Sequence, residues 1–131
     1  MHIHLSPADG VPIYLQIVTQ VKYLVAAGRL SPGDELPPIR ALAERLVVNP
    51  NTIARAYREL EAAGVVVTNR GGGTRVADAG PAPARRECLA ALTKRIDALL
   101  AEARQMNVGT EEVIDLVRRR DRAMRPRAGE E

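Results

Sequence analysis

The chain has 131 residues, 46% hydrophobic and 27% charged, which is the composition expected of about one soluble globular domain. The formal net charge is +3, and aromatic residues make up only 2% of the chain, which disfavours a protein that stacks single-stranded bases on aromatic rings. No apolar run reaches the length of a membrane span, no signal peptide is recognisable, and one cysteine excludes an intramolecular disulfide framework, so we expect a cytoplasmic protein.

The first thirty residues predict a short strand, a turn and an amphipathic helix. Residues 2–5 alternate polar and apolar side chains like a strand, and residues 6–10 are typical of a turn. Pro12 lies where the first turn of a helix over 12–27 is expected, and Gly28 is placed to end that helix in a left-handed conformation. Apolar residues at spacings of three and four define the buried side of this helix: Ile13, Ile17, Val21, Leu24 and Val25.

Two short helices separated by a few residues are predicted next. Pro37 and Pro38 open the first helix, and Asn49 and Pro50 are the expected N-cap and first residue of the second, which runs to Gly64. The apolar side of the first holds Ile39, Leu42, Ala43 and Leu46, and that of the second holds Ile53, Ala56, Tyr57 and Leu60. Asn51, Arg55 and Arg58 cluster on the opposite side of the second helix. This arrangement is typical of a helix-turn-helix.

A β-hairpin is predicted directly after these helices. A β-branched run at residues 65–68 and a second short strand at 74–76 flank the glycine-rich segment 69–73. A hairpin in this position is the wing of a winged helix. A phosphate-binding glycine loop is the alternative, but no Gly-Lys-Ser/Thr sequence follows and no helix opens after the glycines.

Charge and side-chain chemistry point to a duplex-DNA surface. Residues 40–75 hold six arginines against three acidic residues, a local excess expected of a DNA-binding face, although a solvated arginine-rich surface is the alternative. The N-terminal end of a recognition helix points at base edges in the major groove, and Asn49, Asn51 and Thr52 occupy that end here. Asn49 can equally be a helix cap alone. Arg55 and Arg58 lie further along the same side, within reach of phosphate or guanine.

The last third of the chain predicts a helical dimerisation region. A seam of apolar residues repeats at spacings of three and four, which one isolated helix cannot bury: Leu89, Leu92, Ile96, Leu99, Ala103 and Met106. A final helix capped by Thr110 carries an apolar stripe of Val113, Ile114 and Val117. We therefore expect a DNA-binding domain at 1–78, a linker at 79–84, a two-helix dimerisation region at 85–127 and a frayed tail at 128–131.

No residue cluster predicts catalysis, a cofactor or a metal site. His2 and His4 share one side of the expected strand, but without a third ligand nearby they are expected to be surface or packing residues. Cys88 is expected to be a small buried hydrophobe, with a redox sensor as the alternative. No pair of acids with a matched His, Ser or Lys is present, so we expect a protein that is not an enzyme.

The motifs resemble those of the GntR family of bacterial transcription regulators. Gly33-Asp34-Glu35-Leu36-Pro37-Pro38-Ile39-Arg40-Ala41-Leu42-Ala43 is similar to the family's G-D-x-L-P-S-x-R-x-L-A pattern. The segment from residue 48 to 64 resembles its recognition-helix region, and residues 70–76 resemble its wing. The opening Pro12-Ile13-Tyr14 and the Asn-Pro-Asn-Thr sequence are most like the YtrA-type subfamily. Two positions depart from the pattern: Pro38 replaces the usual serine, and Val47 replaces a frequent glycine, which would strain it if that residue needs a positive φ.

This resemblance implies a fold, a function and further site residues. The implied fold is mainly α with a small β-hairpin: an N-terminal winged helix-turn-helix followed by a C-terminal two-helix dimerisation tail. It implies that Arg40 touches DNA and that Arg70, with Gly71, enters the minor groove. It also implies a homodimeric repressor that binds a pseudo-palindromic operator and controls its own operon and an ABC transporter. An unknown small-molecule effector would need a cavity between subunits or between head and tail. The alternative function is a winged-helix adaptor for proteins, which would expose apolar residues on the recognition face.

Overall fold

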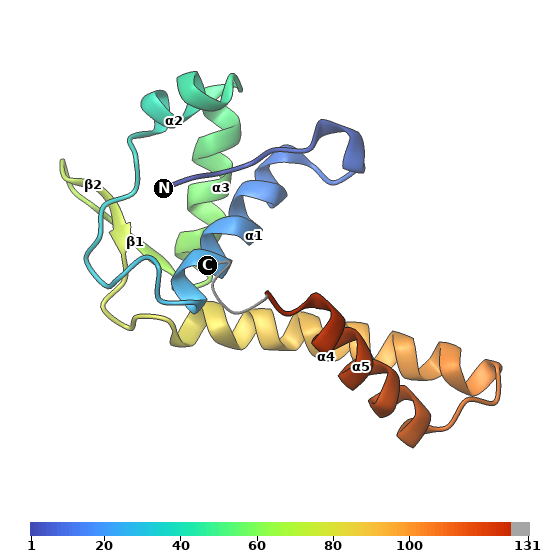
Figure 1. The fold of residues 1–131 in the computed structure, drawn as a ribbon. Coiled ribbons are helices and arrows are strands. Elements are labelled where there is room, and N and C mark those ends of the chain that lie inside the picture. The colour runs from blue at the N-terminus through green and yellow to red at the C-terminus, as the bar shows by residue number, and fades with distance from the viewer. Residues whose placement is uncertain (127–131) are drawn as a thin grey trace. The chain divides into compact units, whose positions relative to one another are not determined.

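Helices dominate the computed structural model, which describes residues 1–126 (Figure 1). The first five elements in chain order are η1 (Pro7–Asp9), α1 (Ile13–Ala26), α2 (Ile39–Leu46), α3 (Pro50–Ala62) and β1 (Val66–Asn69); β2 (Gly73–Val76), α4 (Ala82–Gln105) and α5 (Thr110–Met124) follow. The expected fold class is confirmed: a helix-turn-helix with a two-stranded hairpin comes first and two helices follow. The expected frayed tail at 128–131 lies outside the described residues.

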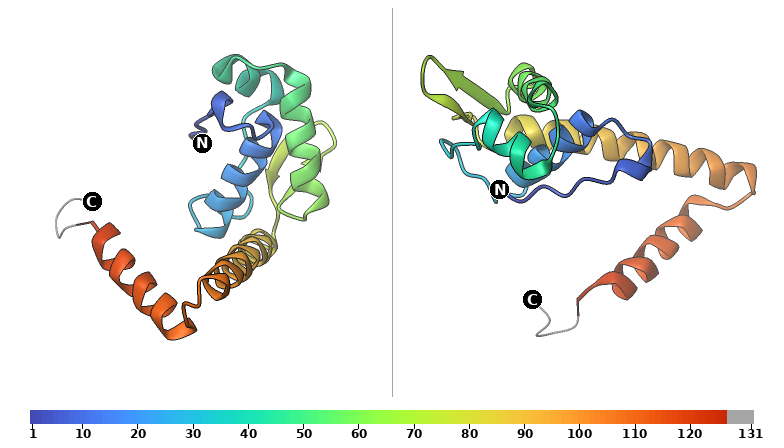
Figure 2. Two further views of the ribbon diagram at one scale, coloured as in Figure 1. Left: turned by 90° about the vertical axis from the view of Figure 1, so that its right-hand side faces the viewer. Right: turned by 90° about the horizontal axis from the view of Figure 1, so that it is seen from above.

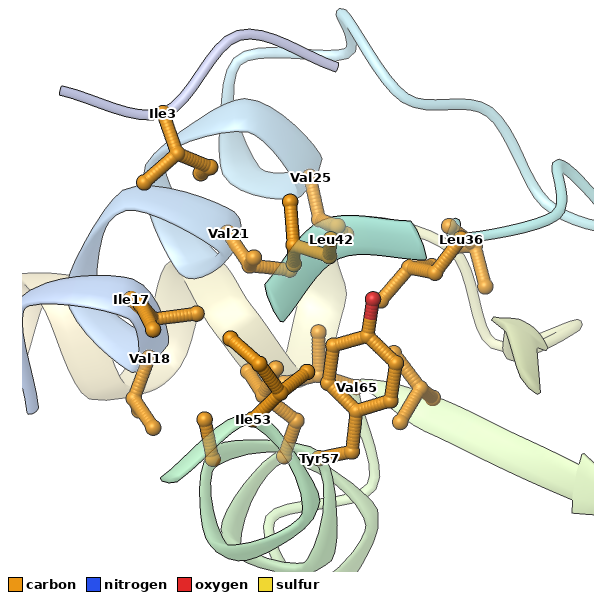
Figure 3. Packing of buried hydrophobic residues seen from close by; sticks show 14 of the residues in the cluster. Ile3, Ile17, Val18, Val21, Val25, Leu36, Leu42, Ile53, Tyr57 and Val65 are labelled. Atoms are coloured by element: carbon orange, nitrogen blue, oxygen red, sulfur yellow. The ribbon is translucent and has the colours of Figure 1, made fainter. Parts of the chain in front are cut away.

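The chain divides into two compact units, Met1–Leu89 and Ala90–Glu131, which we call the head and the tail. The head contains one hydrophobic core between α1, α2 and α3 (Figure 3). Its fully buried side chains include Ile17, Val21, Val25, Leu42, Ile53, Leu60 and Val65. No polar or charged residue within 1–126 is buried, so the core is held by apolar burial, which contributes about 25 cal/mol per Å².

The N-terminal segment forms no strand, which corrects the expectation for residues 2–5. Side chains of α1 take the place of a neighbouring strand. The backbone N–H of His4 donates to Gln20 Oε1 over 2.9 Å, and Gln20 Nε2 donates back to the His4 carbonyl over 2.6 Å. Gln16 forms the same pair of bonds with Ser6, at 2.8 and 3.0 Å. These glutamine clamps hold the segment so that Ile3 is buried in the core.

The helix ends of the head differ from the sequence prediction only in detail. Pro12 is the N-cap of α1 rather than a residue of its first turn, and Gly28 adopts the expected positive φ of 76° just after the helix. Ile39 was expected on the buried side of α2, but it is 37% exposed because it begins the helix at the rim of a groove facing the wing. Leu42 and Ala43 carry the contact with the core instead.

The hairpin is hydrogen-bonded to the segment that leads into α2. β1 and β2 pair antiparallel, with Val66 opposite Val76 and Asn69 opposite Gly73. The segment that leads into α2 pairs with the other edge of β2: Leu36 N–H donates to the Thr74 carbonyl, and Val76 N–H donates to the Asp34 carbonyl, both over 2.8 Å. The wing therefore shares backbone hydrogen bonds with the entry to α2.

α4 begins inside the segment expected to be a linker. It starts at Ala82, and Ala84 is fully buried in the head's core cluster. Glu87 pairs with Lys22 of α1. Residues 79–84 are therefore partly helical and partly packed, because prolines are tolerated in a first helical turn and the small alanines fit against the core.

In the tail, α5 turns back after the loop that ends α4, and the two helices diverge from that loop (Figure 2). Ala103 and Val113 are buried in this unit. Thr110 was expected to cap α5 but is its first residue, and the N-cap is Gly109, which makes no side-chain cap bond. Within residues 1–126, no helix combines the length and apolarity required to span a bilayer.

Val47, which ends α2, has the positive φ that would explain the glycine frequent at this position in the family pattern. It lies in the left-handed region at φ 56° and ψ 54°, and its side chain is 88% exposed, so packing does not compensate for the strain. A β-branched residue in this region costs about 1–2 kcal/mol.

We therefore expect Val47→Gly to raise the free energy of unfolding by about 1 kcal/mol, less than the strain itself because glycine also loses more chain entropy on folding. Urea unfolding followed by circular dichroism measures this change. Ala41→Gly is the matched control, because it places glycine at an exposed position inside the same helix and should lower stability by about 1 kcal/mol. A loss of stability in both variants would contradict the strain at Val47.

Candidate nucleic-acid interface

The outer side of α3 is polar because its inner side supplies the head core. Ile53, Ala56 and Leu60 are fully buried. Asn51 and Arg58 are exposed on the other side, and Thr52 is half-buried between the two. The amphipathic pattern of the sequence thus places amide, hydroxyl and guanidinium groups on one accessible flank of this helix.

Asn49 caps α3 as the sequence predicts. Its Oδ1 accepts a hydrogen bond from the Asn51 backbone N–H over 2.8 Å, and Pro50 occupies the first helical position. The cap uses only the oxygen of the side-chain amide, and the residue is exposed. Asn49 therefore has a structural role through its side-chain oxygen. The cap does not use the N–H₂ group of the same side chain.

Arg40 lies between two surface grooves of the head. One groove of about 720 Å³ runs from α2 to the start of α3 and is lined by Arg40, Val47, Asn49 and Pro50 among others. A second, of about 550 Å³, lies between the start of α2 and the wing, and Arg40, Gly72 and Gly73 are among the residues that line it. The two grooves also contain Glu44 and Glu35 respectively. Arg40 thus borders both the groove at the N-terminal end of α3 and the groove beside the wing.

The wing tip is built for close backbone approach. Arg70 is exposed at the tip, and Gly71 and Gly73 adopt positive φ values of 69° and 75°. A Cβ atom on Gly72 would lie 3.1 Å from Asn69 Cβ, closer than ordinary packing. Glu61 of α3 steadies the adjoining strand by accepting from Thr68 N–H over 2.9 Å. The tip therefore presents one guanidinium on a turn in which the positive φ values of Gly71 and Gly73 favour glycine.

Arg55 is exposed, as expected, but it has a partner that the sequence did not reveal. Its Cζ atom lies 3.7 Å from the centroid of the Tyr14 ring on α1. Tyr14 appeared in the sequence only as part of the Pro-Ile-Tyr resemblance, and no pattern connected it with a residue 41 positions away. The structure therefore adds Tyr14 to the flank that carries Arg55.

Two other residues near α3 have structural roles. Tyr57 is buried as expected, and its hydroxyl donates to the Pro37 carbonyl over 2.7 Å. Burial raises the pKa of Tyr57 to about 12, against a smaller opposing effect of Arg45, so the hydroxyl keeps its proton at neutral pH. Arg45 Nη2 donates to the Met1 carbonyl over 2.9 Å and so fastens the N-terminal segment to α2.

The remaining sequence candidates do not form a chemical site. His2 and His4 are both exposed, and residues 1–126 contain no group of three or more histidine, cysteine, aspartate or glutamate side chains that could hold a metal. Cys88 is a free thiol and is half-buried rather than fully buried as expected.

The apolar seam of α4 is mostly uncovered. Leu92, Ile96, Leu99 and Met106 are 46–64% exposed, as is Leu89 at the end of the head unit. Ala103 differs from the rest of the seam because it is buried, lining with Val113 a groove of about 540 Å³ between α4 and α5. Exposed Leu116 and Val117 of α5 extend the same apolar surface.

Comparison with known proteins identifies relatives that match most of the chain. The family model "Bacterial regulatory proteins, gntR family" matches residues 13–76. The HTH-type transcriptional repressor YtrA of Bacillus subtilis is 33% identical over 116 residues, covering 88% of this chain and 89% of that protein.

Solved structures give the same picture. A transcriptional regulator from Oenococcus oeni has a TM-score of 0.75 and 33% identity, covering 87% of this chain and 94% of that one. The DNA-binding domain of AraR in complex with operator ORX1 has a TM-score of 0.52 and 26% identity, covering 59% of this chain and 99% of that one.

The cap at Asn49 yields a stability prediction that is separate from any ligand. We expect Asn49→Ala to lower the free energy of unfolding by about 1 kcal/mol, because the Asn51 N–H loses its acceptor. Asn49→Asp should retain wild-type stability, since a carboxylate accepts the same bond and suits the positive end of the helix. Urea unfolding of both variants measures the difference, and equal stability of the two would show that the cap contributes nothing.

Proposed function

Since the chain belongs to the GntR family of bacterial regulatory proteins, we propose that it binds duplex DNA sequence-specifically as a homodimeric repressor. The observation that carries this proposal is the accessible polar flank of α3, with Arg40 in the groove at the start of that helix and Arg70 exposed at the wing tip. A major groove admits one α-helix, and the neighbouring minor groove attracts arginine where it is narrow.

In this proposal the residues divide between base reading and backbone contact. Asn51 and Thr52, with the amide of Asn49, meet base edges at the N-terminal end of α3, and Arg58 reaches phosphate further along the helix. Arg40 contacts the phosphate backbone of the DNA between its major and minor grooves. Arg70 enters the minor groove, and Gly71 lets the backbone of the wing approach the DNA closely.

The chemistry of α3 favours DNA over a protein partner. An adaptor would present apolar residues on its recognition face. None of the large exposed hydrophobic residues within 1–126 lies on α3, although Val47 is exposed just before it. A protein-interaction adaptor that uses the same winged helix remains the second candidate function. The DNA-binding experiment below decides between a DNA-binding regulator and an adaptor.

Dimerisation is supported by the uncovered seam of the tail. Contiguous exposed apolar surface on a small domain marks an interaction site, and a second copy of the same helices supplies a matching apolar surface. Two heads related by a twofold axis meet two half-sites of a pseudo-palindromic operator. By its resemblance to YtrA-type repressors, we propose that the dimer controls its own operon together with genes for an ABC transporter.

One prediction from this proposal concerns the wing. Duplexes selected from a random-sequence pool by the wild-type protein provide an operator, and its Kd is measured by mobility shift. Arg70→Ala should weaken binding by about tenfold or more without changing the thermal midpoint of unfolding. Arg29→Ala, which removes an exposed arginine that lines neither groove, should bind as the wild type does. Selection of no consensus sequence would reject operator binding and favour the adaptor.

Another prediction from this proposal concerns the tail. Ile96→Glu places a charge in the centre of the seam and should convert the protein to monomers, because an unpaired buried carboxylate costs several kcal/mol. Ala101→Glu is the control, since Ala101 is exposed and lies on the opposite side of α4 from the seam. Sedimentation equilibrium should give twice the chain mass for wild type and Ala101→Glu. A wild-type chain that sediments as a monomer contradicts the homodimer.

A further inference from the structure

The stacked pair of Tyr14 and Arg55 joins the first turn of α1 to the middle of α3. The guanidinium carbon lies 3.7 Å from the ring centroid, so the two planar groups are in contact. Arg55 is exposed and Tyr14 is half-buried against the head core. None of the ion pairs found within residues 1–126 includes Arg55, so a tyrosine face rather than a carboxylate holds this guanidinium.

The kind of partner decides what Arg55 can still bind. A carboxylate would take up the in-plane N–H donors of the guanidinium and neutralise its charge. An aromatic ring contacts only the face, which leaves the charge and the in-plane donors available for a second, bidentate partner. Arginine prepared in this way is suited to phosphate, whose oxygens match the spacing of the donors.

The place of Tyr14 is fixed by the fold around it. Gln16 donates to the Val11 carbonyl over 3.0 Å and clamps Ser6 through two further bonds, so the loop that enters α1 is tied to the helix. α1 and α3 pack directly against each other in the head. The ring thus offers a fixed surface beside the exposed flank of α3, one turn beyond Asn51.

We propose that Tyr14 is a positioning residue of the DNA interface: its ring holds Arg55 in the orientation that binds a backbone phosphate of the duplex. This inference rests on the proposed DNA binding and adds to it a contact that involves α1. The benefit is preorganisation, because an arginine that is already ordered loses less side-chain entropy when it binds. The contact is to phosphate, so it contributes affinity without base preference.

Four variants separate positioning from ordinary packing. Arg55→Ala should weaken binding to the selected operator by about tenfold, equally across sequences, and reduce the slope of log Kd against log salt by about one. Tyr14→Leu should weaken binding by about threefold to fivefold, the range expected from a surface cation–π contact. Tyr14→Phe retains the ring and should bind as the wild type does. Tyr23→Leu removes an exposed tyrosine from the same helix and should also leave Kd unchanged.

The double variant Tyr14→Leu/Arg55→Ala distinguishes an effect of the ring through Arg55 from an independent structural effect of Tyr14. If the ring acts through Arg55, adding Tyr14→Leu to Arg55→Ala should cause no further loss of affinity. An undiminished loss in that background would show that Tyr14 acts independently and would overturn the inference. A change of base preference at one operator position in Arg55→Ala would overturn the phosphate contact.

The free protein gives a test that does not need DNA. Stacking shifts the NMR signals of the Arg55 side-chain protons upfield through the ring current, and the shift should persist in Tyr14→Phe and vanish in Tyr14→Leu. Absence of the shift in the wild type overturns the inference. If the wild type selects no duplex, the proposed function and this inference both fall; if it binds and Tyr14→Leu matches it, only this inference falls.

Discussion

The burial of one side of α3 is the constraint on which the rest of the head depends. Ile53, Ala56 and Leu60 have no exposed surface, and the α1 and α2 side chains that cover them complete the core. Each such aliphatic side chain contributes about 1.5–3 kcal/mol relative to an exposed one. Because this face is fully committed, the rotation of α3 about its axis is fixed, and so is the direction in which its polar flank points.

Polar contacts outside the core then fix the parts that surround α3. The Tyr57 hydroxyl reaches across to the Pro37 carbonyl at the entry to α2, and Glu61 holds the Thr68 N–H at the start of the wing. The same entry segment pairs with β2 through Leu36 and Val76. One helix thus organises both neighbours, and the grooves that share Arg40 are the spaces left between them.

Local signals in the sequence were sufficient for the helices, the hairpin and the cap at Asn49, because each is decided within a few residues, whereas the strain at Val47 was indicated by the glycine frequent at that position in the family pattern. They were insufficient for features that depend on a contact with a residue far away in the sequence. Residues 2–5 alternate like a strand, yet their partners are glutamine side chains of α1. Ala84 reads as linker but packs into the core, and Arg55 reads as a free cation but lies on Tyr14. The family resemblance supplied Arg40 and Arg70, which spacing alone would not have selected.

The two glutamine clamps also fix the number of residues between their partners in the N-terminal segment. Gln16 and Gln20 are four residues apart on a helix that rises about 1.5 Å per residue, which separates them by about 6 Å. Ser6 and His4 are two residues apart in an extended segment that rises about 3.3 Å per residue, which gives nearly the same distance. The spacing of the two glutamines along α1 therefore matches the spacing of their partners along the N-terminal segment, which runs in the opposite direction. Because the match holds only for alternate residues, a single-residue insertion between Ile3 and Ser6 would put the register out of step, and the peptide that reaches Arg45 would no longer be that of Met1.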